Sequence, residues 1–214
     1  MDRLPRGRHG LSPEFVARNQ RERLIAGLTQ ALYEVGYQKT TVSIIGRRAA
    51  VSKSDFYKHF ESKDDCFVAA YDAAIERIRE QVFAACEAAE GRAWPERVRT
   101  AIAALLDLFD REPALASMAL VEGLRAGRGV YDRYQAALDS FVGVLSRGVP
   151  RLEVGEEVPE ATDEAVIGGI ASLLGRRILG GEGERLSELF PEILEFTLAS
   201  YMGAEEARRI VSAG

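Results

Sequence analysis

The sequence predicts an all-α fold in which a small N-terminal domain of three helices precedes a larger helical domain. Apolar residues recur along the chain at helical spacing, and no convincing strand-length run alternates apolar and polar residues. Helix-start signals and Gly or Pro breaks divide the chain into segments of helical length. With 214 residues, 47% of them hydrophobic, the chain is long enough for one or two domains with a substantial core.

The first helix is expected to start at Ser12-Pro13-Glu14, which supplies a capping hydroxyl, a proline at the first helical position and a carboxylate near the positive end of the dipole. Gly36 is expected to end it. The apolar residues between these points recur at helical spacing: Leu24, Ile25, Leu28, Ala31, Leu32 and Val35.

Two short helices are expected next, joined by a tight turn over residues 49–51. Thr40 or Thr41 caps the second helix, and Ser52 caps the third. Phe56 and Phe60 stand four residues apart and therefore share the inner face of the third helix. We therefore expect a basic flexible arm over residues 1–12, a helix-turn-helix domain over 13–62 and a helical domain over 63–214.

The larger domain contains further segments with helical periodicity and clear breaks. A solvated loop is expected over residues 150–162, and Thr162-Asp163-Glu164 is expected to cap the helix that follows it. The expected helices cover residues 62–90, 95–111, 114–125, 130–148, 163–179 and 186–202, with a short one from Ala204.

The two domains differ in charge, although the whole chain carries −5. Residues 1–60 hold 11 basic and 5 acidic side chains, whereas the rest of the chain holds 17 and 28. A basic N-terminal part and an acidic remainder suggest a phosphate-binding domain attached to another domain. In a helix-turn-helix the second helix enters the major groove of DNA, and the exposed positions of residues 40–60 are polar or basic.

Other classes of protein are poorly supported. The chain has no phosphate-binding glycine loop, no Gly-x-Ser-x-Gly and no His-Glu-x-x-His, so an enzyme is not expected. Its two cysteines, Cys66 and Cys86, are about 30 Å apart along one expected helix and are read as buried apolar residues. With two histidines, no metal or other cofactor is expected. No apolar run approaches the ~20 residues of a membrane span, and a cytoplasmic location is the default.

Residues 18–75 resemble the DNA-binding domain of the TetR family of bacterial transcription regulators. The matching runs are Thr40-Thr41-Val42, Ala49-Ala50-Val51-Ser52-Lys53, Phe56-Tyr57-Lys58-His59-Phe60 and Ser62-Lys63-Asp64, and the segment from Ala31 to Tyr37 fits the family's first helix. The chain departs from the family at Ile45-Gly46-Arg47-Arg48, Ser54 and Asp55, so the operator sequence is not carried over.

The resemblance implies a set of DNA-contacting side chains. Thr41, Tyr57 and Lys63 would bind phosphates, while Ser43, Lys53 and Ser54 would lie nearest the base edges. Lys58 and His59 could do either, and Arg47 is either a phosphate contact or a solvated charge. The arginines of the N-terminal arm either enter a minor groove or belong to a solvated tail. The full set is Thr41, Ser43, Arg47, Ser52, Lys53, Ser54, Tyr57, Lys58, His59 and Lys63.

The family's C-terminal domain binds a small molecule and dimerises through its last two long helices. Candidate ligand-binding residues form an aromatic and apolar set, each of which is alternatively a plain core residue: Phe67, Tyr71, Phe83, Trp94, Phe109, Met118, Tyr131, Tyr134 and Phe141. Glu122 and Arg125 could orient a polar group of the ligand. Candidate dimer-interface residues are Val166, Gly169, Ile170, Leu173, Ile193 and Phe196.

The leading hypothesis is a sequence-specific, homodimeric repressor that a small hydrophobic or aromatic effector releases from a palindromic operator on double-stranded DNA. The helix that starts at Lys63 would transmit the effect of the ligand. Two alternatives stay open, namely an activator and a regulator that acts without a ligand. No membrane partner is expected.

Overall fold

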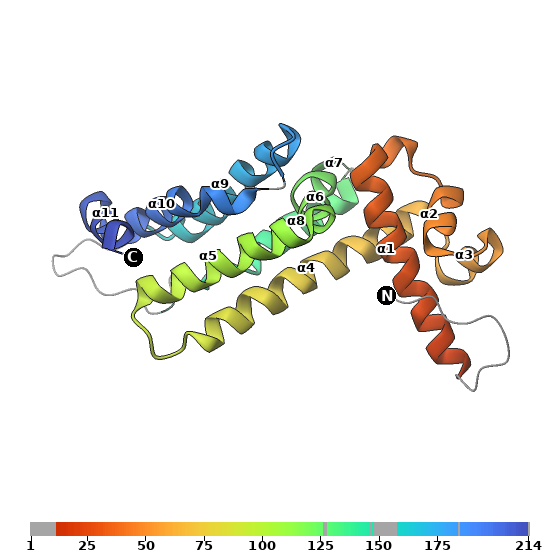
Figure 1. Cartoon of the computed structure of the whole chain (residues 1–214), viewed down its shortest axis with the longest axis horizontal. Helices are drawn as coiled ribbons and strands as arrows, with labels where there is room; N and C mark the ends of the chain where they lie inside the picture. Colours follow the sequence, from red (N-terminus) through yellow and green to blue (C-terminus); the bar gives the residue numbers. More distant parts are fainter. Residues whose placement is uncertain (1–11, 126–127, 146, 148–157, 184, 214) are drawn as a thin grey trace. The chain divides into compact units, whose positions relative to one another are not determined.

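The computed structural model describes residues 12–125, 128–145, 147, 158–183 and 185–213. Every regular element in these ranges is a helix, which confirms the predicted all-α class (Figure 1). The chain forms two compact units, residues 1–74 and 75–214, which divide inside helix α4 (Lys63–Ala88). The domain boundary expected at residue 62 coincides with the start of that helix. The basic arm lies outside the described residues.

Helix α1 (Pro13–Lys39) begins as predicted, because Ser12 Oγ accepts a hydrogen bond from Phe15 N at 3.2 Å. Gly36 breaks its helical geometry with φ 74° and ψ 167°, a backbone conformation that glycine adopts without steric penalty. One further turn follows the predicted end point and runs to Lys39. Thr40 then closes the helix, since its N–H donates to the carbonyls of Gly36 and Tyr37.

Helices α2 (Val42–Ala49) and α3 (Lys53–His59) form the predicted helix-turn-helix. Thr41 caps α2, with its hydroxyl accepting from Ile44 N at 3.3 Å. Ser52 caps α3 by accepting from Asp55 N at 3.0 Å. Between the two helices Ala50 adopts the left-handed conformation, with φ 49° and ψ 44°.

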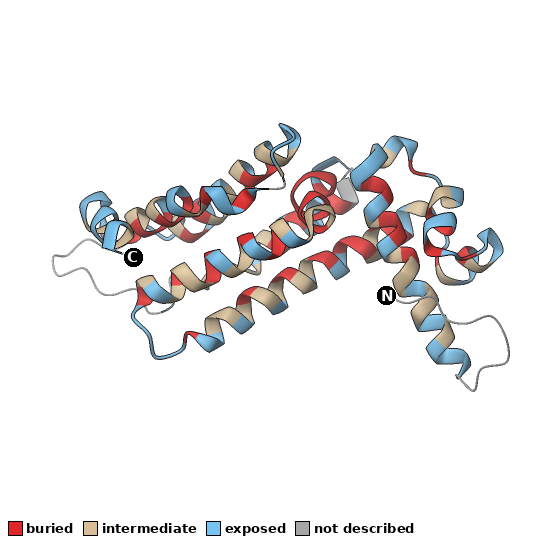
Figure 2. Ribbon diagram, viewed as in Figure 1, coloured by how far each residue is buried: buried red, intermediate tan, exposed pale blue. Residues whose placement is uncertain are grey.

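The core of the N-terminal unit forms where α1, α2 and α3 meet. Buried positions occur on each of these helices (Figure 2), and Leu24, Leu28, Ile45 and Phe56 are fully buried, as predicted for Leu24, Leu28 and Phe56. Each such side chain stabilises the fold by roughly 1.5–3 kcal/mol relative to an exposed one. Gly27 permits a close approach of α1 and α2, because a Cβ there would lie 3.1 Å from the Ile45 carbonyl oxygen.

The C-terminal unit contains the rest of α4 and the helices that follow it. Helix α5 (Trp94–Arg111) precedes a continuous helical run made of α6 (Pro113–Ser117), η1 (Met118–Glu122) and α7 (Gly123–Arg125). This run was predicted as one helix over residues 114–125. Its middle segment, η1, is a π-helix, which the sequence pattern did not predict.

Helix α8 (Arg128–Asp139) is shorter than predicted. The helix was expected to continue to residue 148, but residues 140–145 and 147 form turns, and Gly143 has a φ of 80°. Ser140 Oγ donates to the Ala137 carbonyl oxygen at 2.7 Å, and Trp94 Nε1 donates to the Leu145 carbonyl oxygen at 2.6 Å. These bonds stabilise a turn and hold the segment against α5, so tertiary contacts outweigh the helical periodicity of the sequence here.

Helix α9 (Thr162–Leu179) has no side-chain cap at its start, so the predicted capping role of Thr162-Asp163-Glu164 is wrong. Asp163 is instead buried and accepts hydrogen bonds from the Tyr201 hydroxyl and, at 2.7 Å, from Gly143 N. Only part of the solvated loop predicted over residues 150–162 can be checked, because residues 150–157 lie outside the described ranges.

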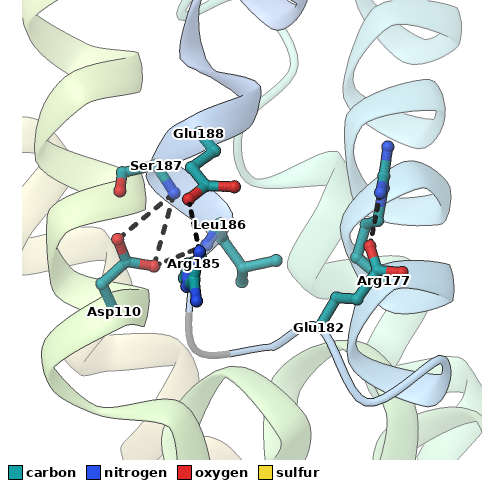
Figure 3. Close-up of polar contacts among 7 residues, drawn as sticks. All are labelled: Asp110, Arg177, Glu182, Arg185, Leu186, Ser187 and Glu188. Carbon is teal, nitrogen blue, oxygen red and sulfur yellow. Dashed lines mark hydrogen bonds and ion pairs between the residues drawn. The ribbon is translucent and has the colours of Figure 1, made fainter.

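The helix predicted over residues 186–202 begins with a 3-10 turn, η2 (Leu186–Leu189), before α10 (Phe190–Met202). Pro191 occupies the first turn of α10, where its missing N–H is tolerated. Asp110 of α5 accepts from Leu186 N at 2.7 Å and from Ser187 N at 3.3 and 3.4 Å (Figure 3). This anchor explains the tighter first turn. Helix α10 packs on α5, α9 and α11 (Ala204–Ala213).

None of the described helices combines the length and the apolar character that a membrane span requires.

Candidate nucleic-acid interface

The outer face of α2 and α3 brings together most of the predicted DNA-contacting side chains. Tyr57 is 51% exposed although it is aromatic, and its ring packs edge-on against the buried Phe56 at 5.4 Å between centroids. Its hydroxyl is therefore presented outward on a ring that the core supports. The exposed members of the predicted set are Thr41, Ser43, Arg47, Ser52, Lys53, Ser54, Tyr57 and Lys58.

A polar network at the start of α3 engages part of this face. Ser52 Oγ donates to Asp55 Oδ2 at 2.7 Å and lies 2.9 Å from Ser54 Oγ, while Lys58 Nζ donates to Asp55 Oδ1 at 2.7 Å. The Lys58 hydrogen bond, followed by that of Ser52, lowers the pKa of Asp55. Ser52 is thus mainly a helix cap, and Lys58 is already paired. Among the described residues Arg47 and Lys53 form no salt bridge.

His59 is half-buried at the end of α3, where its Nε2 donates to Gln20 Oε1 of α1 at 3.1 Å. Burial and, after it, the nearby guanidinium of Arg21 lower the pKa of His59. The neutral ring is therefore favoured, and Nε2 already has a protein partner.

Lys63 is also half-buried, and the last turn of α1 holds it. Its Nζ donates to the Tyr37 carbonyl oxygen at 3.0 Å and stands 3.7 Å from the centroid of the Tyr37 ring. The Tyr37 hydroxyl donates to Asp64, and its ring packs edge-on against Phe67 at 5.5 Å. Burial, with Asp64 as the second cause, raises the pKa of Tyr37. Tyr37 therefore fixes the position of a predicted phosphate-binding lysine.

Arg23, which the sequence analysis did not single out, and Gly46 support the turn between α2 and α3. Arg23 Nη2 donates to the Ala50 carbonyl oxygen at 2.9 Å and so supports the left-handed residue. At Gly46 a Cβ would lie 2.7 Å from the Val51 carbonyl oxygen, while Val51 N donates to the Gly46 carbonyl oxygen at 2.9 Å. This contact explains why glycine stands at position 46. In the sequence, the signal for Arg23 was that a basic residue stands next to the apolar positions of α1.

The predicted ligand-binding residues are divided between the two units. Phe67 and Tyr71 are buried in the N-terminal unit, on the first part of α4. In the C-terminal unit, three separate aromatic contacts bring together Phe83 with Phe141 at 6.2 Å, Trp94 with Tyr201 at 5.2 Å, and Tyr131 with Tyr134 at 6.5 Å. Trp94, Phe109, Met118 and Tyr134 are buried and fit the alternative core reading, whereas Tyr131 is 45% exposed.

A cavity of about 330 Å³ lies beside the turn between α9 and η2, and none of these aromatic residues lines it. Arg177 pairs with Glu182, and Arg185 Nη1 lies 3.2 Å from Glu188 Oε1 (Figure 3). The charges are therefore balanced, and the cavity does not match the hydrophobic ligand that was expected. It is lined by Arg177, Gly181, Glu182, Arg185, Glu188 and Leu189.

The predicted dimer-interface residues divide into two groups. Val166 and Ile193 are buried in the protomer core, so their side chains do not reach its surface. Phe196 is 49% exposed, and a Cβ at Gly169 would lie 3.4 Å from its ring, so Gly169 leaves room for that ring on α9. Ile170 and Leu173 are partly exposed. The surface members of the set are thus Gly169, Ile170, Leu173 and Phe196.

Cys66 and Cys86 are both free thiols, and burial raises the pKa of Cys66 to about 12. Within the part of the chain that the structure describes, no group of three or more His, Cys, Asp or Glu side chains is arranged to hold a metal ion.

Comparison with known proteins agrees with the resemblance seen in the sequence. Residues 24–70 match the family model of bacterial regulatory proteins of the tetR family. No curated protein sequence matches the chain. Among solved structures, the fatty acid degradation regulator FadR from Bacillus halodurans has a TM-score of 0.73 at 15% identity, over 89% of this chain and 97% of that one.

Two further solved structures have the same fold. FadR from Bacillus subtilis, in complex with stearoyl-CoA, has a TM-score of 0.66 at 19% identity and covers 85% of this chain and 98% of its own. The TetR-family regulator SCO4454 from Streptomyces coelicolor has a TM-score of 0.66 at 24% identity, with coverages of 86% and 96%.

The helix-turn-helix and the all-α fold define the class of the protein as a transcription regulator that binds DNA. Residues 24–70 match the family model of the TetR family of bacterial regulatory proteins, and the fold of the chain is that of TetR-family regulators.

Proposed function

We propose that the protein is a homodimeric repressor that binds a palindromic operator and leaves it when a small hydrophobic or aromatic molecule binds the C-terminal unit. The observation that carries the proposal is the outer face of α2 and α3, where Arg47, Lys53 and Tyr57 are exposed on helices with capped N-termini. Cationic and hydroxyl groups on such a face suit phosphate oxygens and base edges.

Within this proposal, Thr41, Tyr57 and Lys63 bind phosphates, and Ser43, Lys53 and Ser54 approach the bases. Lys53 starts α3, and the N-terminal residues of a recognition helix are those that reach base edges. Two copies of α3 would lie about 34–36 Å apart, the spacing of successive major grooves. The partly exposed residues Ile170, Leu173 and Phe196 on α9 and α10 are the proposed contact with the second copy.

Support for a hydrophobic effector comes from a protein of similar fold, since FadR from Bacillus subtilis was crystallised with stearoyl-CoA. An activator and a ligand-independent regulator remain the alternative functions. A reporter gene under the chain's own upstream DNA separates them, because a repressor lowers its output and an activator raises it. A regulator without ligand control has the same effect on reporter output in the presence of every compound tested.

DNA binding is tested by fluorescence anisotropy with DNA from the upstream region of the gene over a series of salt concentrations. Replacing Tyr57 or Lys63 by alanine should weaken binding to all sequences, and loss of the Lys63 charge should reduce the slope of log affinity against log salt by about 0.9. Arg92→Ala, which removes an exposed charge from the C-terminal unit, is the matched control and should leave both quantities unchanged. Equal slopes for all three variants would contradict the assigned face.

A further inference from the structure

Glu122 is a carboxylate in the interior of the C-terminal unit. It ends the π-helix η1 and is 4% exposed. All nine residues from 115 to 123 are buried, so this stretch lies in the interior of the unit. A charged side chain at such a position is unusual unless it is paired.

The negative charge of this carboxylate is only partly compensated by neighbouring groups of the protein. Arg125 Nη1 lies 3.5 Å from Glu122 Oε1, but the Arg125 side chain is 58% exposed, so solvent screens its charge. Glu122 Oε2 is buried and has no hydrogen-bond partner among the described residues. Burial raises the pKa of Glu122, while Arg125 lowers it to a smaller extent. A buried acceptor without a donor destabilises the free protein.

The backbone around Glu122 is also irregular. Single π-helical turns within α-helices are rare and occur frequently at functional sites. Here the turn packs closely on α9, since a Cβ at Gly175 would lie 3.3 Å from the Leu120 carbonyl oxygen. Gly123, which has no side chain, follows Glu122, and the small residue Ala119 lies three positions before it in the same buried stretch. An apolar residue at position 122 would satisfy this core better than a carboxylate, so packing alone does not explain Glu122.

We propose that Glu122 is the polar anchor of the effector site, and that the effector is an apolar molecule with a positively charged nitrogen, an ammonium or amidinium group, which donates a hydrogen bond to Oε2. A cation compensates a buried negative charge, whereas a neutral donor supplies the hydrogen bond alone and an anionic head group is repelled. This inference rests on the proposed function, because it specifies the class of molecule that the C-terminal unit binds.

The test is isothermal titration calorimetry of the full chain with three probes that share one apolar tail: n-decylammonium, n-decanol and n-decanoate. The wild-type protein should bind decylammonium roughly tenfold or more tightly than decanol, the difference expected for a hydrogen bond to a charged group. Decanoate should bind most weakly. Equal binding of the amine and the alcohol, tighter binding of decanoate, or no binding of any probe would overturn the inference.

Glu122→Gln keeps the shape of the side chain and removes its charge. The preference for decylammonium over decanol should disappear in this variant, while decanol binding should stay unchanged. Glu87→Gln, an exposed position on α4, is the control and should keep the wild-type preference. The midpoint of thermal unfolding of ligand-free Glu122→Gln should not fall, whereas a purely structural Glu122 predicts a lower midpoint. A retained amine preference in Glu122→Gln contradicts the proposal.

Arg125→Ala is an independent test of Glu122 as the anchor, because it changes an exposed side chain and leaves Glu122 in place. Without the neighbouring guanidinium, decylammonium should bind more tightly than it does to wild type, and decanol should bind equally to both. An unchanged or weaker affinity for decylammonium would count against Glu122 as the anchor.

Release of operator DNA is measured separately. If the amine preference depends on Glu122 but no probe releases DNA, the proposed ligand control fails and the inference about Glu122 stands. If decanoate binds and releases DNA, the proposed function stands and the inference about Glu122 fails.

Discussion

In the N-terminal unit most polar side chains of α2 and α3 face outward, whereas in the C-terminal unit buried and partly buried carboxylates join distant parts of the chain. Ser52 caps α3 from one residue before it, and Asp55 bonds to Ser52 and Lys58 within a few positions. Asp163 instead accepts from Tyr201, 38 residues away, and Asp110 accepts from Leu186, 76 residues away. Local bonds leave a surface available for a partner, and long-range buried bonds fix a core.

The largest expected effect concerns the buried bonds of the C-terminal unit. Asp163→Ala removes the acceptor for the Tyr201 hydroxyl and Gly143 N, and leaves buried donors unsatisfied. The free energy of unfolding should fall by about 3 kcal/mol, as measured by urea denaturation. Glu164→Ala changes the exposed neighbour and should alter stability by less than ~0.5 kcal/mol. Similar losses for both variants would remove the contrast between buried and exposed acidic residues.

A second prediction concerns the tight turn of the helix-turn-helix. Gly46→Ala places a Cβ 2.7 Å from the Val51 carbonyl oxygen, so the turn must shift. Stability should fall by about 2 kcal/mol, within the range for overpacking, and DNA affinity should fall with it. Gly168→Ala is the matched control, since a Cβ there meets nothing within 4 Å, and it should stabilise α9 by up to ~1 kcal/mol. A neutral Gly46→Ala would show that this contact does not restrict the turn.

The left-handed Ala50 gives a smaller effect of opposite sign. Ala50→Gly relieves a conformation that is unfavourable for alanine by roughly 1–2 kcal/mol, although glycine gains entropy in the unfolded chain. A net stabilisation of about 0.5 kcal/mol is expected in thermal unfolding. Ala88→Gly, at the end of α4, should instead destabilise the protein. Destabilisation by Ala50→Gly would argue against strain at the turn.

The smallest effect is a pH dependence at His59. Its folded pKa is lowered by burial and by Arg21, so the neutral ring stabilises the fold at pH values above the ordinary histidine pKa. This contribution is lost as the pH falls through the folded pKa. The loss of stability between pH 7.5 and pH 5 should therefore be smaller in His59→Gln than in wild type, as followed by urea denaturation. An equal loss in both proteins would show that His59 does not titrate with folding.

The difference between the units also explains which features the sequence predicted. Ser12, Thr41, Ser52 and Gly36 act on backbone groups within a few residues, so their roles follow from local spacing, and the helix-turn-helix was predicted with its caps. The α2–α3 face followed from the same local pattern. Its supports on α1, Arg23 and Tyr37, act across 26 or 27 residues and were not predicted as such.

The C-terminal unit was predicted less well for the same physical reason. Helix α8 ends early because Trp94, 51 residues from Leu145, holds the following segment in a turn. Asp163 resembled a capping residue in sequence, and only the position of Tyr201 shows that it is a buried acceptor. Glu122 was noted as a possible polar contact, but its burial and the π-helix follow from tertiary packing, which helical periodicity does not encode.

The central claim, that the exposed face of α2 and α3 reads DNA sequence, is tested most directly by selecting bound sequences from a random DNA library. The wild-type protein should enrich a palindrome whose half-sites lie about one helical turn apart, or a multiple of it. Lys53→Ala should enrich a different or degenerate sequence within the half-site, whereas Arg92→Ala should enrich the wild-type palindrome. The absence of any enriched palindrome, or the same one with Lys53→Ala, would contradict the account.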